Sequence, residues 1–443
     1  MNVLLLGSGG RESALAWKIK QSKHCDNLYI APGNGGTAQY GVNIELAILD
    51  FEAIEKFCKE QNISIIVCGP ELPAVHGLWD YFQSHQSIIV IAPSQISAQL
   101  EGSKAFAKEF MKKHHIPTAE YIEVTKANIE DGFHWFETKN PPFVIKANGL
   151  AEGKGVVIAT TKAEAEMTLK DFIENQKFGE SSAKVVLEEF LDGIEFSMFV
   201  FTNGKNYVML PNAKDYKRRF EGNIGLNTGG MGCISPVPFI DESMEAKVKT
   251  QVIEPTINGL QQDNMPYFGF IYFGLINVDG QPKVIEYNCR LGDPETEVLL
   301  PRIESDLMEM FWAGIDEKKI DRIGFESFRA IKSTLENFEV NISSQYCATV
   351  ILASNGYPEA YLKGFEISGI DQVNESIVFH AGTKLIGSKC VTHGGRVMAV
   401  SSLGNSLNEA LERSYQSINL IQFQGKVYRN DIGFEFNLSL IHI

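Results

Sequence analysis

The first hundred residues alternate short β-branched runs with segments of helical periodicity, and few folds accept that order. Strands are predicted at 2–6, 28–30, 63–67 and 87–91, with helices between them at 12–21, 51–61 and 74–85. This order predicts an open parallel α/β sheet, whose ligands bind at the carboxyl ends of the strands. The run at 2–6 is read as a first strand, because it is too short for a secretion signal and lacks its basic leader.

Beyond residue 103 the pattern changes to α+β, and a chain of 443 residues exceeds what one core can hold. A Gly- and Asn-rich loop is expected at 222–232. Helices are predicted at 104–114, 162–175 and 406–418, and strands at 142–146, 155–160, 184–190, 347–353, 376–380 and 395–401. Strands are also expected to dominate the stretches 194–211 and 267–287. We expect an N-terminal α/β substrate domain at 1–101, a central module at 102–328 with a flap subdomain inserted near 122–193, and a C-terminal mixed α+β domain at 329–443.

Charge and composition exclude several classes of partner. A formal net charge of −15 without a basic tract disfavours nucleic acid and anionic membranes. The longest apolar runs, such as 63–68 and 87–92, are far shorter than the roughly 20 residues of a membrane span. The seven cysteines are scattered without a Cys-x-x-Cys pair, which is typical of reduced, buried thiols. We therefore expect a cytoplasmic protein that binds neither nucleic acid nor membrane.

The loop 7–12 (Gly-Ser-Gly-Gly-Arg-Glu) follows the first predicted strand and opens a helix. It matches a dinucleotide fingerprint only in part, since Glu12 stands where the third glycine belongs. A nicotinamide cofactor is therefore not expected, although the free N–H groups at a helix start suit a phosphate. The alternative is a tight strand-to-helix turn without a ligand.

Residues 146–155 (Lys-Ala-Asn-Gly-Leu-Ala-Glu-Gly-Lys-Gly) suggest phosphate binding but fail the Walker A pattern. Only three residues separate Gly149 from Gly153, and no Ser or Thr follows Lys154. The segment fits better as a flexible flap between two strands, with free backbone amides that can fold over a triphosphate. The alternative is a solvated hairpin tip.

Two further predicted strands lead into polar residues that suit a nucleotide and a metal. Strand 184–190 runs into an acidic turn at 191–195, where the backbone can bind adenine and carboxylates can accept from ribose hydroxyls. Glu286, Asn288 and Arg290 alternate along one strand and so share a face. Carboxylate and amide oxygens suit Mg²⁺, while the alternative for this strand is a buried structural ion pair.

These motifs occur in the order of an ATP-grasp module (phosphate lysines, flap, adenine hinge, metal strand), and the chain resembles that superfamily. Within it, the chain is similar to the glycinamide ribonucleotide synthetase family over nearly its whole length. The runs at 227–232 (Asn-Thr-Gly-Gly-Met-Gly) and 292–296 (Gly-Asp-Pro-Glu-Thr) are specific to that family. The stretches that carry the resemblance are 7–12, 98–104, 227–232, 290–296, 379–383 and 394–397.

The resemblance assigns roles to individual residues. Those implied to contact ATP are Lys104, Lys146, Gly153, Lys154, Gly155, Glu188, Phe190, Leu191 and Glu195. Those implied to bind the other substrates are Gly9, Gly10, Arg11, Glu12, Gly69, Pro70, Glu71, Asp215, Lys217, Asn227, Thr228, Gly229, Gly230, Arg290 and Asp293. Glu286 and Asn288 would hold the metal, and Lys146, Asp215 and Arg290 would act at the reacting centre.

The implied reaction is the ATP-dependent ligation of glycine to 5-phosphoribosylamine through glycyl phosphate, with Mg²⁺ or Mn²⁺, by a monomer in purine biosynthesis. The alternatives are another ATP-grasp carboxylate–amine ligase or carboxylase of that pathway, and a protein that senses ATP without turnover. Three departures from the family pattern are Ser13, where the first helix usually has His, Asn148, where the flap usually has Asp, and the run at 212–216 (Asn-Ala-Lys-Asp-Tyr), where a Gln-Asp-His context is more usual. The strand at 269–276 offers no second acidic metal ligand.

Overall fold

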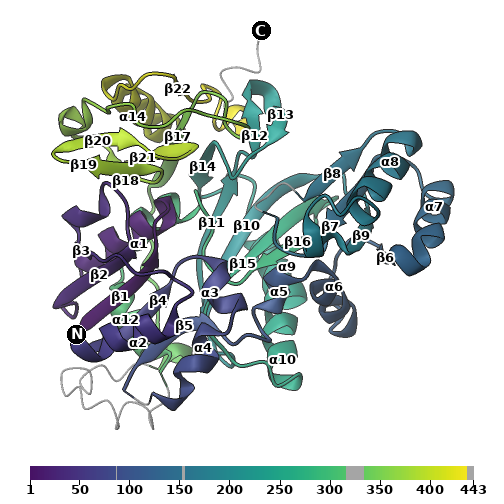
Figure 1. Ribbon diagram of the computed structural model, residues 1–443, viewed down its shortest axis with the longest axis horizontal. Coiled ribbons are helices and arrows are strands. Elements are labelled where there is room, and N and C mark those ends of the chain that lie inside the picture. Colours follow the sequence, from purple (N-terminus) through teal and green to yellow (C-terminus); the bar gives the residue numbers. More distant parts are fainter. Residues whose placement is uncertain (86, 152–154, 316–333, 437–443) are drawn as a thin grey trace.

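The structure, a computed structural model, describes residues 1–85, 87–151, 155–315 and 334–436 (Figure 1). Its first five strands pair in parallel in the order β5-β4-β1-β2-β3, so the predicted parallel α/β sheet is confirmed. Their side chains are almost all buried in β1, β4 and β5, as expected of a sheet covered on both faces. The elements are β1 (Asn2–Gly7), α1 (Gly10–Lys20), β2 (Asn27–Pro32), η1 (Thr37–Gln39), β3 (Val42–Asn43), α2 (Phe51–Glu60), β4 (Ile63–Cys68), α3 (Glu71–Val75), α4 (Leu78–Tyr81), η2 (Phe82–Ser84), β5 (Ile89–Pro93) and α5 (Gln99–Gly102).

The predicted continuous helix at 74–85 is wrong. The segment consists of α3, α4 and the short turn η2. Gly77 lies between α3 and α4 with φ +85, a left-handed conformation that glycine adopts readily and that ends a right-handed helix. Glu71, the first residue of α3, lines a cavity together with residues of the loops that follow the parallel strands.

The central part extends the sheet with antiparallel strands. Strand β15 pairs with β5 on one side, with β10 on the other, and separately with β16, so the N-terminal and central strands share one 14-stranded sheet. The elements are α6 (Lys104–Lys113), β10 (Ile194–Thr202), β11 (Tyr207–Asp215), β14 (Gly232–Ser235), α9 (Glu242–Val248), η6 (Lys249–Ile253), α10 (Glu254–Gln262), β15 (Tyr267–Val278), β16 (Gln281–Asn288), α11 (Thr296–Arg302) and α12 (Leu307–Ala313).

A small four-stranded sheet in the order β6-β9-β7-β8 lies beside the main body and carries the flap (Figure 1). Two helices cover it, and Leu169, Phe172 and Leu187 are fully buried in its own hydrophobic core. The elements are β6 (Tyr121–Thr125), η3 (Lys126–Asn128), α7 (Ile129–Thr138), β7 (Phe143–Ala147), β8 (Val156–Ala159), α8 (Lys162–Ile173), η4 (Gly179–Ser182) and β9 (Lys184–Glu189).

The C-terminal strands join the same large sheet, because β17 pairs with β14 through Cys233 and Thr349 and their neighbours. The stretch at 222–232, expected as a loop, contains part of a hairpin, β12 with β13, and the first residue of β14. The elements are β12 (Arg218–Phe220), η5 (Glu221–Asn223), β13 (Ile224–Asn227), η8 (Leu335–Asn337), β17 (Tyr346–Ser354), η9 (Ile370–Gln372), β18 (Ile377–His380), β19 (Thr383–Ile386), β20 (Lys389–Thr392), β21 (Arg396–Gly404), α14 (Leu407–Leu420), β22 (Lys426–Val427) and η10 (Phe434–Phe436).

Two expectations from composition can be compared with the structure. All seven cysteines are free, and all but Cys390 are buried, as predicted. Among the helices of the described residues, none has the length and apolar character needed to cross a bilayer.

Candidate active site

A cavity of 1040 Å³ opens where the central sheet, the flap sheet and the N-terminal domain meet. Its walls come from segments far apart in the sequence, including α6, β7, β9, β11 and β16. Most of the predicted ATP, metal and reaction residues line it. They are Arg11, Glu71, Lys104, Lys146, Gly155, Glu188, Phe190, Leu191, Glu195, Asp215, Lys217, Asn227, Thr228, Gly229, Glu286, Asn288, Arg290 and Asp293.

Three lysines line the part of the cavity formed by α6 and β7. Lys146 on β7 is 2.8 Å from one carboxylate oxygen of Glu188, and Lys108 on α6 is 3.0 Å from the other. Lys104, one helical turn before Lys108, donates to the carbonyl of Gly149 at 3.1 Å. Burial lowers the pKa of Lys104, and it lowers that of Lys108 to about 8. These amines are thus buried donors suited to phosphate oxygens.

The segment predicted to bind adenine combines one buried residue with others that are accessible. Glu188 is only 4% exposed, and its carboxylate faces the lysines, whereas Phe190 just beyond β9 is 40% exposed. Glu195, at the start of β10, pairs with Lys217 at 3.2 Å, and the charge of Lys217 is the largest contribution that lowers the pKa of Glu195. Phe190 and Leu191 therefore line the cavity beyond β9, while Glu188 contacts two lysines.

The flap strands β7 and β8 occur as predicted, with Gly155 at the start of the return strand lining the cavity. The predicted ligands Gly153 and Lys154 lie outside the described residues. Asn148 caps helix α6: its side-chain oxygen accepts from Ser103 Oγ at 3.0 Å and from the Ala105 N–H at 2.8 Å. The departure from Asp thus preserves an oxygen acceptor at a helix start.

Glu286 and Asn288 project from β16 into the cavity. Neither side chain forms a hydrogen bond or ion pair with a residue that the structure describes. Two uncommitted oxygen donors two positions apart on one strand fit a hard divalent cation. The strand ends at Asn288, so the prediction that Arg290 lies on it is wrong, although Arg290 still lines the same cavity.

Arg290 is held by two carboxylates. Its Nε lies 3.2 Å from Glu71 Oε2, and its Nη2 lies 2.7 Å from Glu101 Oε1. The side chain of Glu101 is only 5% exposed, and burial raises its pKa to about 7 although Arg290 lowers it. The two acids fix the guanidinium at the junction of the N-terminal domain and the central sheet.

A second cavity of 610 Å³ adjoins the first, because Arg11, Glu71 and Asp293 line both. Gly9, Glu12 and Pro70 also line it, as expected for a substrate site at the strand ends. The start of α1 is already occupied by carboxylates. The Gly9 N–H donates to Glu12 at 2.6 Å and the Arg11 N–H donates to Asp293 at 3.1 Å.

Three predicted substrate residues line neither cavity, and close packing explains each. A Cβ on Gly10 would lie 2.2 Å from Glu297 Oε1, and one on Gly69 would lie 2.2 Å from Glu12 Oε1. Gly230 has φ +113 and packs against Pro294. These glycines permit close approach of the loops that carry the cavity walls.

Four cavity residues were missed as ligands: Glu101, Lys108, Glu295 and Arg396. Arg396 on β21 lies 2.9 Å from Asp293 and donates to the Gly229 carbonyl at 2.5 Å, which joins the C-terminal strands to the site. Three of the four occur in the stretches 98–104, 290–296 and 394–397 that carried the family resemblance, which was the available signal. Lys108 had no comparable motif.

Glu297 on α11 is a fully buried acid, and neither carboxylate oxygen has a hydrogen-bond partner among the described residues. Burial, followed by the charge of Asp293, raises its pKa well above the usual range. The folded state therefore keeps a proton that the unfolded chain releases above about pH 4.5. Folding stability accordingly decreases as the pH rises above that value.

We expect Glu297→Gln to raise the free energy of unfolding at pH 8 by about 1–3 kcal/mol, because the amide never ionises. The gain is expected to shrink toward pH 5, because ionisation of Glu297 in the unfolded wild-type chain contributes less free energy close to the ordinary pKa of the carboxyl group. Urea titrations at both pH values measure it, with Glu375→Gln at an exposed position as the control. A gain that is equal at pH 5 and pH 8 would contradict the prediction.

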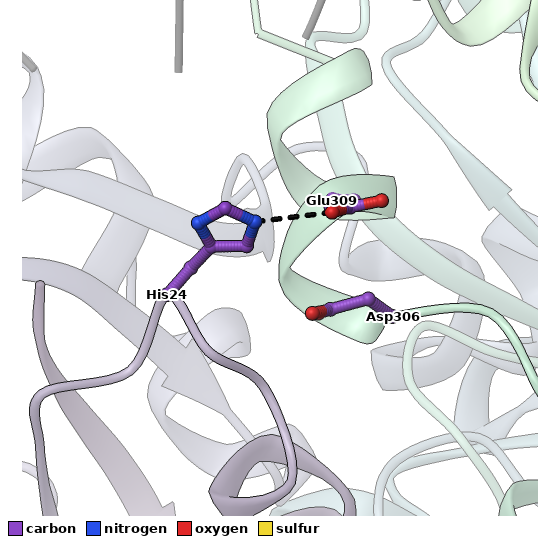
Figure 2. A group of neighbouring side chains, drawn as sticks. All are labelled: His24, Asp306 and Glu309. Carbon is purple, nitrogen blue, oxygen red and sulfur yellow. Dashed lines mark hydrogen bonds and ion pairs between the residues drawn. The ribbon is translucent and has the colours of Figure 1, made fainter. Parts of the chain in front are cut away.

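Figure 2 shows a group of potential metal ligands outside the cavity, His24, Asp306 and Glu309, whose donor atoms lie within 4.8 Å of one another. His24 Nε2 is 3.0 Å from Glu309 Oε1. Asp306 caps α12 through the Met308 N–H and also accepts from Ser22 Oγ at 2.7 Å. These contacts join the N-terminal domain to α12, and we assign the group a structural role.

Comparisons with known proteins agree with this arrangement. The chain matches three domains described for phosphoribosylglycinamide synthetase: the N domain over residues 1–101, the ATP-grasp (A) domain over 102–296 and the C domain over 347–435. It is 44% identical to the phosphoribosylamine–glycine ligase of Vibrio vulnificus, and 42% identical to that of Haemophilus influenzae. Each alignment covers 98% of both chains.

Solved structures agree as well. The crystal structure of phosphoribosylamine–glycine ligase from Thermotoga maritima superposes with a TM-score of 0.80 at 35% identity, covering 97% of this chain and 100% of that one. The biotin carboxylase domain of Hydrogenobacter thermophilus 2-oxoglutarate carboxylase shares the fold alone, with a TM-score of 0.69 at 15% identity, over 96% of this chain and 91% of that one. The chain therefore belongs to the phosphoribosylglycinamide synthetase family of ATP-grasp enzymes.

Proposed function

We propose that this chain uses ATP to join glycine to 5-phosphoribosylamine, producing glycinamide ribonucleotide, ADP and phosphate in purine biosynthesis. The observation that carries the proposal is the convergence on one cavity of phosphate lysines, an adenine hinge, a pair of oxygen ligands and a clamped arginine. The relatives named phosphoribosylamine–glycine ligase, which match over nearly the whole chain, support the choice of substrates.

The chemistry follows from the poor reactivity of a free carboxylate toward amines. The carboxylate of glycine attacks the γ-phosphorus of ATP, which releases ADP and forms glycyl phosphate. The amine of phosphoribosylamine then attacks the acyl carbon, phosphate departs, and the nitrogen loses a proton to give the amide. Lys104 and Lys146 counter the phosphate charge, and Arg290 holds the glycine carboxylate or the transferring phosphoryl group.

Glu286 and Asn288 would hold Mg²⁺ or Mn²⁺, since both side chains line the cavity and neither is bonded to a residue that the structure describes. Bound there, the ion would neutralise charge on the ATP phosphates. Asp215, Lys217 and the residues 227–229 surround the reacting centre. Phosphoribosylamine would extend into the second cavity, toward Gly9, Arg11 and Glu12.

The organisation of the chain is part of the proposal. We propose boundaries after residues 101 and 328, and the first is supported by the adjoining N-domain and ATP-grasp matches. The second lies outside the described residues. We further propose that the enzyme acts as a cytoplasmic monomer.

The direct test is ADP formation by the purified chain with Mg²⁺-ATP, freshly made phosphoribosylamine and glycine, omitting each in turn. ADP that depends on glycine, with glycinamide ribonucleotide identified by mass, is the expected result. ADP formation with bicarbonate in place of glycine would identify a carboxylase instead. ATP binding without ADP formation would identify a sensor, and either outcome would reject the proposal.

A further inference from the structure

Arg429 is a fully buried cation of the C-terminal domain that lines neither of the two cavities. It follows β22, and its carbonyl accepts from the hydroxyl of Tyr415 on α14 at 3.0 Å. Its guanidinium forms a two-pronged ion pair with Asp431, in which Nε and Nη2 lie 2.7 and 2.8 Å from the two carboxylate oxygens. The side chain is therefore held in one orientation by its own domain.

The remaining guanidinium nitrogen of Arg429 reaches out of this domain to the hairpin of β12 and β13. Nη1 donates to the carbonyl of Arg218 at 3.1 Å and to Oδ1 of Asn223 at 2.9 Å. Asn223 has φ +56, a left-handed conformation that is uncommon for residues other than glycine. Asp431 adds a second link, because it accepts from the Gly222 N–H at 2.7 Å. The pair of Arg429 and Asp431 thus holds the first strand and the turn of the hairpin.

The same guanidinium packs on Tyr216, which lies on the other side of Lys217 in the sequence. Its central carbon is 5.4 Å from the centroid of the buried Tyr216 ring, a cation–π distance. Arg429 therefore contacts both the residue before Lys217 and the residue after it. The carbonyl of Lys217 is fixed as well, since it accepts from the N–H and from Oγ1 of Thr228, each at 2.8 Å.

The segment that Arg429 holds forms part of the wall of the main cavity. Lys217, Arg218, Asn223 and Thr228 all line that cavity. The amine of Lys217 pairs with Glu195 at 3.2 Å. A shift of the backbone beside Lys217 would move this amine relative to the reacting atoms, and a misplacement of roughly 1 Å can lower a rate by about 100-fold.

We propose that Arg429 is a positioning residue for the reaction, which fixes the backbone on both sides of Lys217 and so places the Lys217 amine at the reacting centre. The inference rests on the proposed function and adds a residue that lies outside the cavity. Lys104 and Lys146, the lysines proposed to contact ATP, lie on the separate elements α6 and β7. We therefore expect Arg429 to affect the chemical step and not the binding of ATP.

The substitution Arg429→Lys keeps a positive charge beside Asp431 but removes the planar fork that reaches the hairpin. We expect kcat at saturating substrates to fall about 10- to 100-fold, because the Lys217 amine is no longer held in place. KM for ATP is expected to stay within about threefold of the wild-type value. Initial rates of ADP formation measure both constants.

Hydrogen exchange gives a readout that does not depend on activity. The N–H groups of Thr228 and Met231 donate to the carbonyls of Lys217 and Tyr216. In Arg429→Lys, we expect the peptide that covers residues 215–231 to exchange at least about tenfold faster, with the rest of the chain unchanged. Exchange followed by mass spectrometry measures this change.

A double variant separates positioning from a general loss of stability. In a Lys217→Gln background, Arg429→Lys is expected to change the residual kcat by less than about threefold, because no amine remains to be positioned. A merely structural role would lower kcat by the same factor in both backgrounds. Single-turnover rates at high enzyme concentration measure the slow variants.

Arg413→Lys is the matched control, because Arg413 belongs to the same domain and bonds to the Leu403 carbonyl of β21 and to Glu409 of α14. It is expected to keep the wild-type kcat and the wild-type exchange of residues 215–231. If Arg429→Lys does not fold, Asp431→Asn weakens the same ion pair from a half-buried position. It is expected to lower kcat and to speed exchange in the same segment.

The proposal would be overturned if folded Arg429→Lys kept the wild-type kcat, or if its effect were equally large with and without Lys217. Unchanged exchange of residues 215–231 would also reject it, and so would a silent Asp431→Asn variant where that variant replaces Arg429→Lys. Failure of the proposed function is distinguishable, because the wild type would then form no glycine-dependent ADP. The exchange experiment would still report whether Arg429 holds the segment.

Discussion

Glu286→Gln is expected to lower kcat by about 1000-fold or more while the protein remains folded. The substitution keeps the size of the side chain and its half-buried position on β16 but removes the charged oxygen ligand. The loss therefore falls on metal binding rather than on packing. Initial rates of ADP formation at saturating glycine and phosphoribosylamine measure it.

The control for this variant is Glu359→Gln, which removes the same charge from an exposed position that does not line the cavity. It is expected to keep wild-type rates. A titration of Mn²⁺ in the presence of ATP, followed by electron paramagnetic resonance, provides a second measure, and the Glu286 variant is expected to bind the ion more weakly. Full activity together with unchanged Mn²⁺ affinity would reject the metal assignment.

Arg290→Met is expected to abolish activity and also to lower the free energy of unfolding by about 3–5 kcal/mol at pH 8. The substitution leaves Glu71 and Glu101 without their shared guanidinium, and Glu101 is buried. Without Arg290, the pKa of Glu101 rises further above its value in the unfolded chain. The folded state then holds a proton that the unfolded state releases, so the loss of stability grows from pH 5 to pH 8.

A second substitution separates the two effects of Arg290. The double variant Arg290→Met with Glu101→Gln no longer has the buried Glu101 carboxylate that the single variant leaves without its cation. We expect much of the lost free energy of unfolding to return while activity stays absent. Urea unfolding of the wild type, both single variants and the double variant completes the thermodynamic cycle. Additive changes in stability would show that Arg290 and Glu101 do not interact as the structure indicates.

Many of the residues that line the cavity could be picked out from the sequence, because each motif is a short contiguous segment. The flap at 146–155, the hinge at 188–195 and the metal strand at 284–288 each carry their own local pattern. The parallel N-terminal sheet was equally readable, since hydrophobic periodicity and chain order specify βαβ units locally. The same local reasoning missed the helix break at Gly77. The helical pattern of the sequence continues through this glycine, and its backbone angle is decided by tertiary packing.

Other features depend on contacts between distant segments. The hairpin of β12 and β13 replaces part of an expected loop because its strands pair with each other despite a turn-like composition. Gly10 and Gly69 were predicted to bind a substrate. In the structure, the side chains of Glu297 and Glu12 occupy the space that a Cβ on these two glycines would need. A glycine motif looks the same in sequence whether its free space receives a phosphate or a carboxylate.

The sequence by itself determined the family, the order of the chemical groups along the chain and the parallel sheet that opens it, since these are properties of local runs of residues. Only the tertiary structure decided which charges meet. Arg290 is clamped by Glu71 and Glu101, and Arg396 of the C-terminal strands pairs with Asp293. Charge pairing depends on the distance between the groups and on their burial, and neither can be read from their separation in the sequence.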